Sequence, residues 1–385
     1  MAIIPRFLSV PHGSSFLFGP RGTGKTTWLR DQLPNALYLN LLRPDLYREL
    51  AARPERLREL VLGNISSSHV IVDEVQRAPE LLNVVHDLIE TPGTPPFVLT
   101  GSSARKLRRG GVDLLAGRAV VRTLHPFLAA EFPEFQLQKA LHTGLVPLVV
   151  TAADPEDTLR SYAAVYVEQE IRAEGLVRNV GNFSRFLEAV SFSHAAVLSV
   201  SNVARESAVS RKTVEGFLEI LDDLLLAFRI PVFTRRARRM VASHPKFYLF
   251  DAGVYRSLRP SGPLDRAEEI DGAALEGLVA QHLRAWIAYS SSDLKLHYWR
   301  TRSGVEVDFV LYGSEGLWCV QVQNSGAVRS SDLRSLKAFR EDYAECSPLL
   351  LYRGQNHLKI DGIHCAPVDW FLRNLRPGSA LPIKW

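Results

Sequence analysis

Short apolar runs alternate with helical patterns in the N-terminal part of the chain. The apolar runs predict four strands, at residues 16–18, 36–41, 70–74 and 97–100. Apolar residues spaced three or four positions apart predict helices between them, from residue 26, over 44–62 and over 79–90. Continuous apolar strands joined by helices are typical of a parallel sheet, so this part is predicted to be an α/β domain.

Beyond residue 126 the pattern becomes mainly helical. Short helices are expected over residues 126–148, a longer helix over 157–171, and three more within 183–228. The last two of these helices are joined by Val209 and Ser210, which predicts a helix-turn-helix. A β-hairpin is predicted from residues 230–233 and 246–250, in the position of a wing.

The last part of the chain begins after a break rich in proline and glycine at residues 260–263. Helical and strand patterns are mixed here, which predicts a second α/β region. The expected elements are a helix at 273–289, strands at 296–301, 305–312 and 317–323, a helix at 330–343 and a strand at 348–352.

Composition narrows the class of protein. The chain has 385 residues, 46% hydrophobic and 23% charged, so two to four globular domains are expected. No apolar run approaches the roughly 18 residues of a membrane span, and the N-terminus lacks a signal-peptide pattern. Three widely spaced cysteines predict a reduced, cytoplasmic setting without structural zinc. The net charge of +5 is compatible with a nucleic-acid partner but does not require one.

A glycine-rich loop lies between the first predicted strand and the first predicted helix. Its spacing is G-x-x-x-x-G-K-T, in which glycines let backbone N–H groups surround a phosphate at a helix N-terminus. Lys25 is predicted to reach the β- and γ-phosphates of ATP, and Thr26 to ligate Mg²⁺. A surface turn that matches by chance is the alternative. The predicted nucleotide-binding residues are Gly19, Pro20, Arg21, Gly22, Thr23, Gly24, Lys25, Thr26 and Thr27.

Two acids end the third predicted strand. Ligands of parallel sheets bind beyond the C-terminal ends of the strands, so Asp73 is predicted to hold Mg²⁺ and Glu74 to activate the attacking water. Two solvated acids at a strand end are the alternative. Thr100, with Ser102 as second choice, is predicted to orient that water from the next strand.

A basic stretch follows. An arginine from a neighbouring subunit would stabilise the charge that spreads over the phosphates in the transition state. Arg118 is the first candidate for this role and Arg105 the second. A solvated helix face is the alternative explanation of the charges.

These motifs resemble a family of bacterial and archaeal AAA-type ATPases that carry a C-terminal domain of unknown function. The resemblance rests on the glycine loop and on the sequences VIVDEVQRAPE, LTGSSARKLRR, LLAGR and FYLFDAGVYRSL. It implies a P-loop core with strand order 5-1-4-3-2, ATP hydrolysis, and a homo-oligomer such as a hexameric ring. The expected domains are the ATPase core at 1–135, a helical lid at 136–190, a winged helix at 191–262 and a restriction-endonuclease-like domain at 263–385.

Clustered cations suggest DNA as a partner. Arginines and lysines at the start of a recognition helix and on a wing would contact phosphates and give salt-dependent binding. A winged helix that packs on the ATPase or binds a protein is the alternative. The candidate residues are Arg211, Lys212, Arg235, Arg236, Arg238 and Arg239.

The nuclease-like region has an incomplete set of catalytic residues. Glu276, Glu306 and Asp308 could hold Mg²⁺, but Gln321 and Gln323 stand where such folds carry a Glu-x-Lys pair. A neutral amide supplies neither the charge that attracts a hard cation nor a cationic side chain. The domain is therefore predicted to be inactive as a nuclease.

Three functions follow as hypotheses. The first is a Mg²⁺-dependent ATPase that acts on DNA as an oligomeric motor or remodelling protein, without a membrane partner. The second is a nucleotide-controlled switch that binds a protein through its C-terminal half. The third is an ATP-dependent nuclease.

Overall fold

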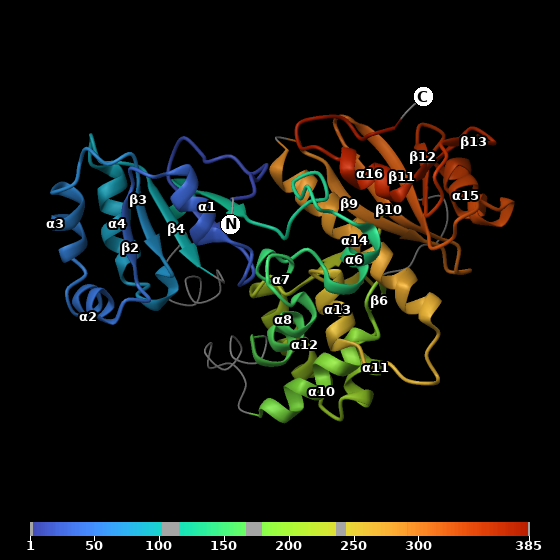
Figure 1. Ribbon diagram of the computed structural model, residues 1–385, viewed down its shortest axis with the longest axis horizontal. Coiled ribbons are helices and arrows are strands. Elements are labelled where there is room, and N and C mark those ends of the chain that lie inside the picture. Colours follow the sequence, from blue (N-terminus) through green and yellow to red (C-terminus); the bar gives the residue numbers. More distant parts are fainter. Residues whose placement is uncertain (1–2, 102–114, 167–178, 236–243, 291, 384–385) are drawn as a thin grey trace. The chain divides into compact units, whose positions relative to one another are not determined.

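The computed structural model describes residues 3–101, 115–166, 179–235, 244–290 and 292–383 (Figure 1). The chain divides into two compact units, which are described separately. The N-terminal unit is Met1–His125 with Asp222–Leu226, and the C-terminal unit is Pro126–Leu221 with Ala227–Trp385. Within the described ranges, no helix is long and apolar enough to cross a bilayer.

The N-terminal unit is built on a sheet of five parallel strands. Their spatial order is β2-β3-β4-β1-β5, which confirms the expected order 5-1-4-3-2 and the α/β class. Four strands match the apolar runs, whereas the fifth had no predicted residues. The strands are β1 (Ser15–Phe18), β2 (Leu37–Asn40), β3 (Val70–Asp73), β4 (Phe97–Gly101) and β5 (Val120–Thr123).

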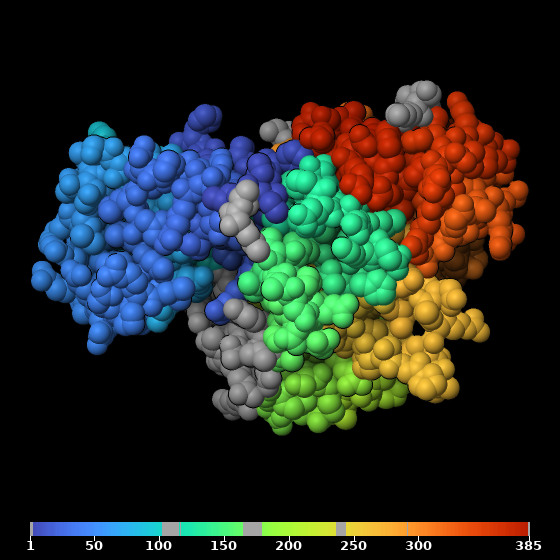
Figure 2. Space-filling view, viewed as in Figure 1, coloured from blue at the N-terminus to red at the C-terminus, as the bar shows by residue number. Residues whose placement is uncertain are grey.

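Helices flank this sheet. The prediction of one helix over 44–62 is wrong, because the chain forms α2 and α3 with a break at Arg53 and Pro54. Proline pushes the preceding residue out of the helical region, and Arg53 has φ −140° and ψ 80°. Both helices lie at the surface (blue, Figure 2). The helical segments are α1 (Lys25–Gln32), α2 (Pro44–Ala52), α3 (Arg56–Leu62), η1 (Val75–Arg77), α4 (Leu81–Glu90) and η2 (Leu115–Gly117).

The first part of the C-terminal unit is helical with a small antiparallel sheet of order β6-β8-β7. The prediction of a helix over 211–228 is wrong at its end: α12 stops at Asp223, Leu225 has φ +59°, and the next residues pair with β8. The elements are α6 (Leu137–Thr143), α7 (Pro147–Val150), α8 (Pro155–Ser161), η3 (Tyr162–Tyr166), α10 (Val180–Ser191), β6 (Ala196–Val197), α11 (Val200–Glu206), α12 (Arg211–Asp223), β7 (Ala227–Ile230), β8 (Lys246–Leu249) and α13 (Ala252–Leu258).

The remainder contains a six-stranded mixed sheet of order β13-β14-β12-β11-β10-β9. Strand β12 is buried along nearly its whole length, as expected for a strand covered on both faces. All six predicted elements are present, while the last two strands and the last helix had no prediction. The elements are α14 (Ala267–Tyr289), β9 (Lys295–Arg300), β10 (Glu306–Gly313), β11 (Gly316–Gln323), η4 (Ser330–Leu333), α15 (Arg334–Asp342), β12 (Ser347–Tyr352), β13 (Leu358–Ile360), β14 (Ile363–Pro367) and α16 (Val368–Asn374).

Helix α14 approaches His194 so closely that Gly277 has no room for a side chain. A Cβ there would lie 2.2 Å from His194 Nε2. The ring cannot move away easily, because it stacks on Tyr255 at 4.0 Å and accepts a hydrogen bond from the Leu249 N–H. We therefore expect Gly277→Ala to destabilise the protein by about 1–3 kcal/mol, measured by thermal unfolding.

Gly272 on the same helix provides the matched control. A Cβ there would meet nothing closer than Asn324 at 3.8 Å. Since alanine favours helices over glycine, Gly272→Ala should leave stability unchanged or raise it by up to about 1 kcal/mol. Equal stability of the two variants would contradict the close packing of His194.

Candidate functional site

The loop between β1 and α1 has the backbone that its glycines predict. Gly22 has φ +82° and Gly24 φ +86°, in the left-handed region that favours glycine. Gly24 is the N-cap of α1, so the loop leads directly into a helix N-terminus. Such an N-terminus presents unpaired N–H groups and a positive dipole end to an anion.

Gly19 is required for a different reason. A Cβ at this position would lie 2.6 Å from the Leu124 carbonyl oxygen, so the loop packs directly on the chain that follows β5. The loop is closed internally by Thr23, whose hydroxyl donates to the Pro20 carbonyl at 2.8 Å. Arg6 donates to the Thr23 carbonyl at 3.1 Å and to the His125 carbonyl at 2.6 Å. The loop is therefore fixed by its own internal hydrogen bond, by Arg6 and by its contact with the chain that follows β5.

Lys25 is the first residue of α1 and is buried against the loop. Its Nζ donates to the Gly19 carbonyl at 2.7 Å. A phosphate bound by the loop would offer this ammonium a charged acceptor, which forms a stronger hydrogen bond than a neutral carbonyl. The lysine is thus placed where the motif predicts it.

Asp73 ends β3 and is buried at the edge of the sheet next to the loop. The hydroxyl of Thr26 donates to Asp73 Oδ2 at 3.1 Å. The hydroxyl of Thr100, on β4, donates to Asp73 Oδ1. The structure therefore brings together three residues that the sequence proposed for the metal and the attacking water.

Tyr38 is a fourth member of this network that sequence reasoning missed. It lies on β2, and its hydroxyl donates to Asp73 Oδ2. Burial, and then the hydrogen bond and charge of Asp73, raise the pKa of Tyr38 well above its usual value, so the phenol keeps its proton. The only signal in the sequence was a tyrosine on the strand that neighbours Asp73.

Glu74 follows Asp73 in a left-handed conformation, with φ +63° and ψ +44°. This region is costly for a residue other than glycine and is often used at functional sites. The Glu74 N–H donates to the Thr100 hydroxyl at 3.3 Å, and its carboxylate accepts a hydrogen bond from Gln76. These contacts stabilise the turn that takes the chain out of the sheet at Glu74.

The oxygen donors fit Mg²⁺. This ion keeps several waters and is held in proteins by one or two carboxylates together with substrate phosphates. Asp73 and Thr26 would supply a carboxylate and a hydroxyl, and the phosphates held by the loop would complete the coordination. Among the described residues, no cluster of three or more His, Cys, Asp or Glu is arranged to bind a metal alone.

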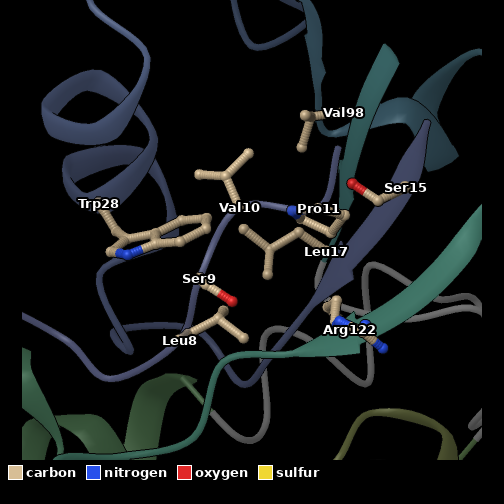
Figure 3. A pocket seen from close by; sticks show the side chains of 9 residues that line it. All are labelled: Leu8, Ser9, Val10, Pro11, Ser15, Leu17, Trp28, Val98 and Arg122. Carbon is tan, nitrogen blue, oxygen red and sulfur yellow. The ribbon is translucent and has the colours of Figure 1, made fainter. Parts of the chain in front are cut away.

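A small apolar hollow lies beside α1 (Figure 3). Its volume of about 10 Å³ is enough for at most one water, so in this conformation it does not accept a nucleobase. The lining residues are Leu8, Ser9, Val10, Pro11, Ser15, Leu17, Trp28, Val98 and Arg122.

Of the two arginines predicted to act on a neighbouring subunit, the structure describes only Arg118. Arg118 Nη2 lies 2.5 Å from the carboxylate of Glu90 within the same chain, and its side chain is partly exposed. Its role toward a neighbouring subunit stays a prediction. Arg105 and Ser102 lie outside the described residues.

The residues predicted to contact DNA differ in their surroundings. Arg211 is exposed at the start of α12 and pairs with Glu215 at 3.4 Å, and Lys212 is exposed beside it. Arg235 lies over the Tyr312 ring at 4.7 Å. The remaining candidates lie outside the described residues: Arg236, Arg238 and Arg239.

The acids of the nuclease-like region converge. Glu276 on α14 and Glu306 and Asp308 on β10 all contact the ammonium of Lys246, a residue that no sequence motif indicated. Gln321 joins them by donating to Asp308 at 2.7 Å. Gln323, by contrast, is the last residue of β11, where it pairs with Tyr352 on β12.

Family comparisons match three consecutive parts of the chain. An AAA domain matches residues 12–133, Domain of unknown function (DUF8612) residues 134–265, and Domain of unknown function (DUF4143) residues 271–371. The AAA match supports an ATPase-like, nucleotide-binding function of the N-terminal part.

Similar proteins add little to this assignment. Two uncharacterized proteins, Rv2008c of Mycobacterium tuberculosis and Mb2031c of Mycobacterium bovis, are each 25% identical over 368 residues, covering 92% of this chain and 80% of theirs. AMPPCP-bound DnaA from Aquifex aeolicus is 12% identical, with 55% of this chain and 82% of that chain covered and a TM-score of 0.26. A TM-score this low supports no inference about this chain.

The three matches agree with the resemblance that the motifs indicated. The glycine loop, the acids Asp73 and Glu74 and all five strands of the parallel sheet lie within the part matched by the AAA domain. Residues 12–133 therefore match an AAA domain, and two domains of unknown function follow it, an arrangement that is consistent with an AAA-type ATPase.

Proposed function

We propose that the N-terminal unit hydrolyses ATP to ADP and phosphate with Mg²⁺ as cofactor. The observation that supports this most directly is the contact of Thr26 with Asp73 beside the glycine loop. In this contact, the hydroxyl and the carboxylate that we expect to hold Mg²⁺ share one hydrogen bond, at the end of the sheet where the loop would hold phosphates.

Each side chain then has a role in the reaction. The loop amides and Lys25 bind the phosphates and offset their charge, Thr26 and Asp73 hold Mg²⁺, and Glu74 accepts a proton from the attacking water. Thr100 fixes Asp73 and the backbone of Glu74 through its hydroxyl. Bound Mg²⁺ supplies charge stabilisation to the β- and γ-phosphates.

Phosphate release tests this function. Purified protein with ATP and Mg²⁺ should liberate inorganic phosphate, and EDTA should stop the reaction because the phosphates lose their metal. The absence of both phosphate release and affinity for adenine nucleotides would refute the proposal.

Tyr38→Phe is expected to weaken the use of Mg²⁺. The hydroxyl of Tyr38 fixes the carboxylate of Asp73, and the loss of such an outer partner typically lowers metal affinity 10- to 100-fold. The Mg²⁺ concentration for half-maximal hydrolysis should therefore rise about 10-fold, while metal-free nucleotide binding stays unchanged.

Tyr47→Phe is the matched control. This tyrosine lies on α2, where its ring is covered by Arg77 at 4.6 Å, so the substitution keeps that packing and removes only a hydroxyl. Its Mg²⁺ dependence should equal that of the wild type. An unchanged Mg²⁺ dependence of Tyr38→Phe would assign Tyr38 no part in metal binding.

The wider role that we propose is that of an oligomeric, DNA-associated ATPase. It is supported by the arrangement of α10, α11 and α12 with the sheet β6-β8-β7, which is the order of elements in a winged helix, and by the cations at the start of α12.

Duplex DNA should raise the ATPase rate several-fold, and salt should reverse the effect. Indifference to DNA would favour a nucleotide-controlled switch that binds protein, and particle images with an ATP analogue would show whether rings form.

A further inference from the structure

A buried lysine lies at the centre of the acidic cluster in the C-terminal unit. Lys246, on β8, is only 1% exposed, and its Nζ lies 2.5 Å from Glu306, 2.8 Å from Glu276 and 3.3 Å from Asp308. The acids belong to α14 and β10, two elements that are distant from β8 in the sequence. A single ammonium thus connects three elements of the fold.

Both glutamates of this cluster have a second donor. The hydroxyl of Tyr248 donates to Glu276 Oε1 at 2.6 Å, and Arg300 Nη1 donates to Glu306 Oε2 at 2.8 Å. Both side chains are partly buried, and carboxylates that lose water need paired, hydrogen-bonded oxygens. Glu306 has a cationic partner at each oxygen, and Glu276 has two donors at Oε1.

Asp308 is satisfied in the same way. Its Oδ2 accepts hydrogen bonds from Gln321 Nε2 at 2.7 Å and from the Val322 N–H at 2.8 Å. The amide oxygen of Gln321 in turn accepts a hydrogen bond from the Ser335 hydroxyl at 3.1 Å. Gln321 therefore presents donors to the cluster and turns its one acceptor oxygen elsewhere, which is the opposite of what a metal ligand does.

The ammonium is held on β8 by the chain itself. Burial lowers the pKa of Lys246, but Glu276, Tyr248 and Asp308 raise it, and the net direction of the pKa is upward. The cation is tethered to β8, whereas a metal ion exchanges with solvent.

From this geometry we propose that the ammonium of Lys246 replaces a divalent cation among the three acids. Carboxylates from separate elements converge on its Nζ as they would on a hard cation, which prefers oxygen ligands of this kind. The wild-type cluster consequently binds no metal and cleaves no phosphodiester bond. It fastens β8 to α14 and β10 and so acts as an internal ionic link in the C-terminal unit.

Mn²⁺ titration of nucleotide-free protein, followed by electron paramagnetic resonance, tests this replacement. Lys246→Ala removes the cation and leaves the acids in place, so it should gain a Mn²⁺ site that the wild type lacks. Adding Asp308→Asn to Lys246→Ala should remove that site again. Any Mn²⁺ bound near Asp73 is common to all these proteins and cancels in the comparison.

Thermal unfolding gives a second readout. Without metal, Lys246→Ala should melt on the order of 10 °C below the wild type, because it leaves the buried Asp308 and the partly buried Glu276 without a cationic partner, and millimolar Mn²⁺ should restore most of the loss. Lys337→Ala is the matched control, since Lys337 pairs with Asp361 at the surface with a side chain that is 42% exposed. It should change neither melting nor Mn²⁺ binding.

If Lys246→Ala does not accumulate as folded protein, refolding from urea with and without Mn²⁺ replaces the melting experiment. Refolding that depends on Mn²⁺ supports the proposal. A Lys246→Ala protein that gains no Mn²⁺ site and is not rescued by the metal overturns it. Mn²⁺ binding by the wild type that Asp308→Asn abolishes, or cleavage of plasmid DNA by the wild type that Lys246→Ala abolishes, would also overturn it and make Lys246 part of an active centre.

Discussion

Glu74→Gln is expected to bind ATP normally and to hydrolyse it about 10²- to 10⁴-fold more slowly, because glutamine cannot accept the proton of the attacking water. The substitution keeps the size of the side chain and its ability to accept a hydrogen bond from Gln76. The left-handed turn at Glu74 is held by the hydrogen bond of its backbone N–H to Thr100, which the variant also retains. Single-turnover phosphate release, with nucleotide affinity measured separately, gives both quantities.

Glu80→Gln is the control for this experiment. Glu80 is exposed at the N-cap of α4, a few residues further along the same connection. Its substitution by glutamine removes the same charge from the same unit. Its turnover should match the wild type. Near-normal turnover of Glu74→Gln would exclude Glu74 as the general base, and loss of ATP affinity would instead give Glu74 a role in binding.

The parallel sheet was predictable because three of its strands, β1, β3 and β4, are short apolar runs that are buried at every position. Strands β3 and β4 are buried at every position, and they coincide with the predicted runs. Strand β5 could not be located in this way, since Val120 and Val121 are exposed and the pattern of a buried strand is missing. The order of the strands came from the resemblance to a family, not from the pattern.

The two wrong helix boundaries have different causes. Residues 44–62 and 211–228 each show a helical spacing of apolar residues that continues beyond the helix that forms. In the first case a single proline, Pro54, ends the helix. In the second case pairing with β8 takes residues 227–230 into a sheet, and a long-range contact of this kind leaves no mark in the local pattern.

The same distinction applies to the candidate site. Lys25, Thr26, Asp73 and Glu74 were found because each belongs to a motif whose spacing is set by one loop or one strand end. Tyr38 was missed because it reaches Asp73 only across neighbouring strands. The same holds for Lys246, which meets its acids through contacts that span 30 to 62 positions of the chain. Residues brought together by the fold alone require the structure.

Lys25→Ala is expected to lower ATP affinity by at least about 10²-fold and to abolish measurable hydrolysis. The variant removes a side-chain charge that the proposed complex directs at the β- and γ-phosphates, and charge-assisted hydrogen bonds to phosphate are among the strongest that proteins form. Folding should be little affected, because the hydrogen bonds that Lys25 gives up at the Gly19 and Pro20 carbonyls go to neutral acceptors and contribute about 1 kcal/mol each. Titration with a fluorescent ATP analogue and thermal unfolding measure the two effects.

Comparing the affinities for ATP, ADP and AMP distinguishes phosphate binding by Lys25 from a general weakening of the loop. Since the ammonium is proposed to contact the β- and γ-phosphates, the affinity lost in Lys25→Ala should be largest for ATP, smaller for ADP and absent for AMP. Arg48→Ala, which removes an exposed cation from α2, should bind all three nucleotides as the wild type does. Equal losses for ATP and AMP would mean that Lys25 shapes the loop through Gly19 instead of binding phosphate, and unchanged ATP affinity would remove the loop from nucleotide binding altogether.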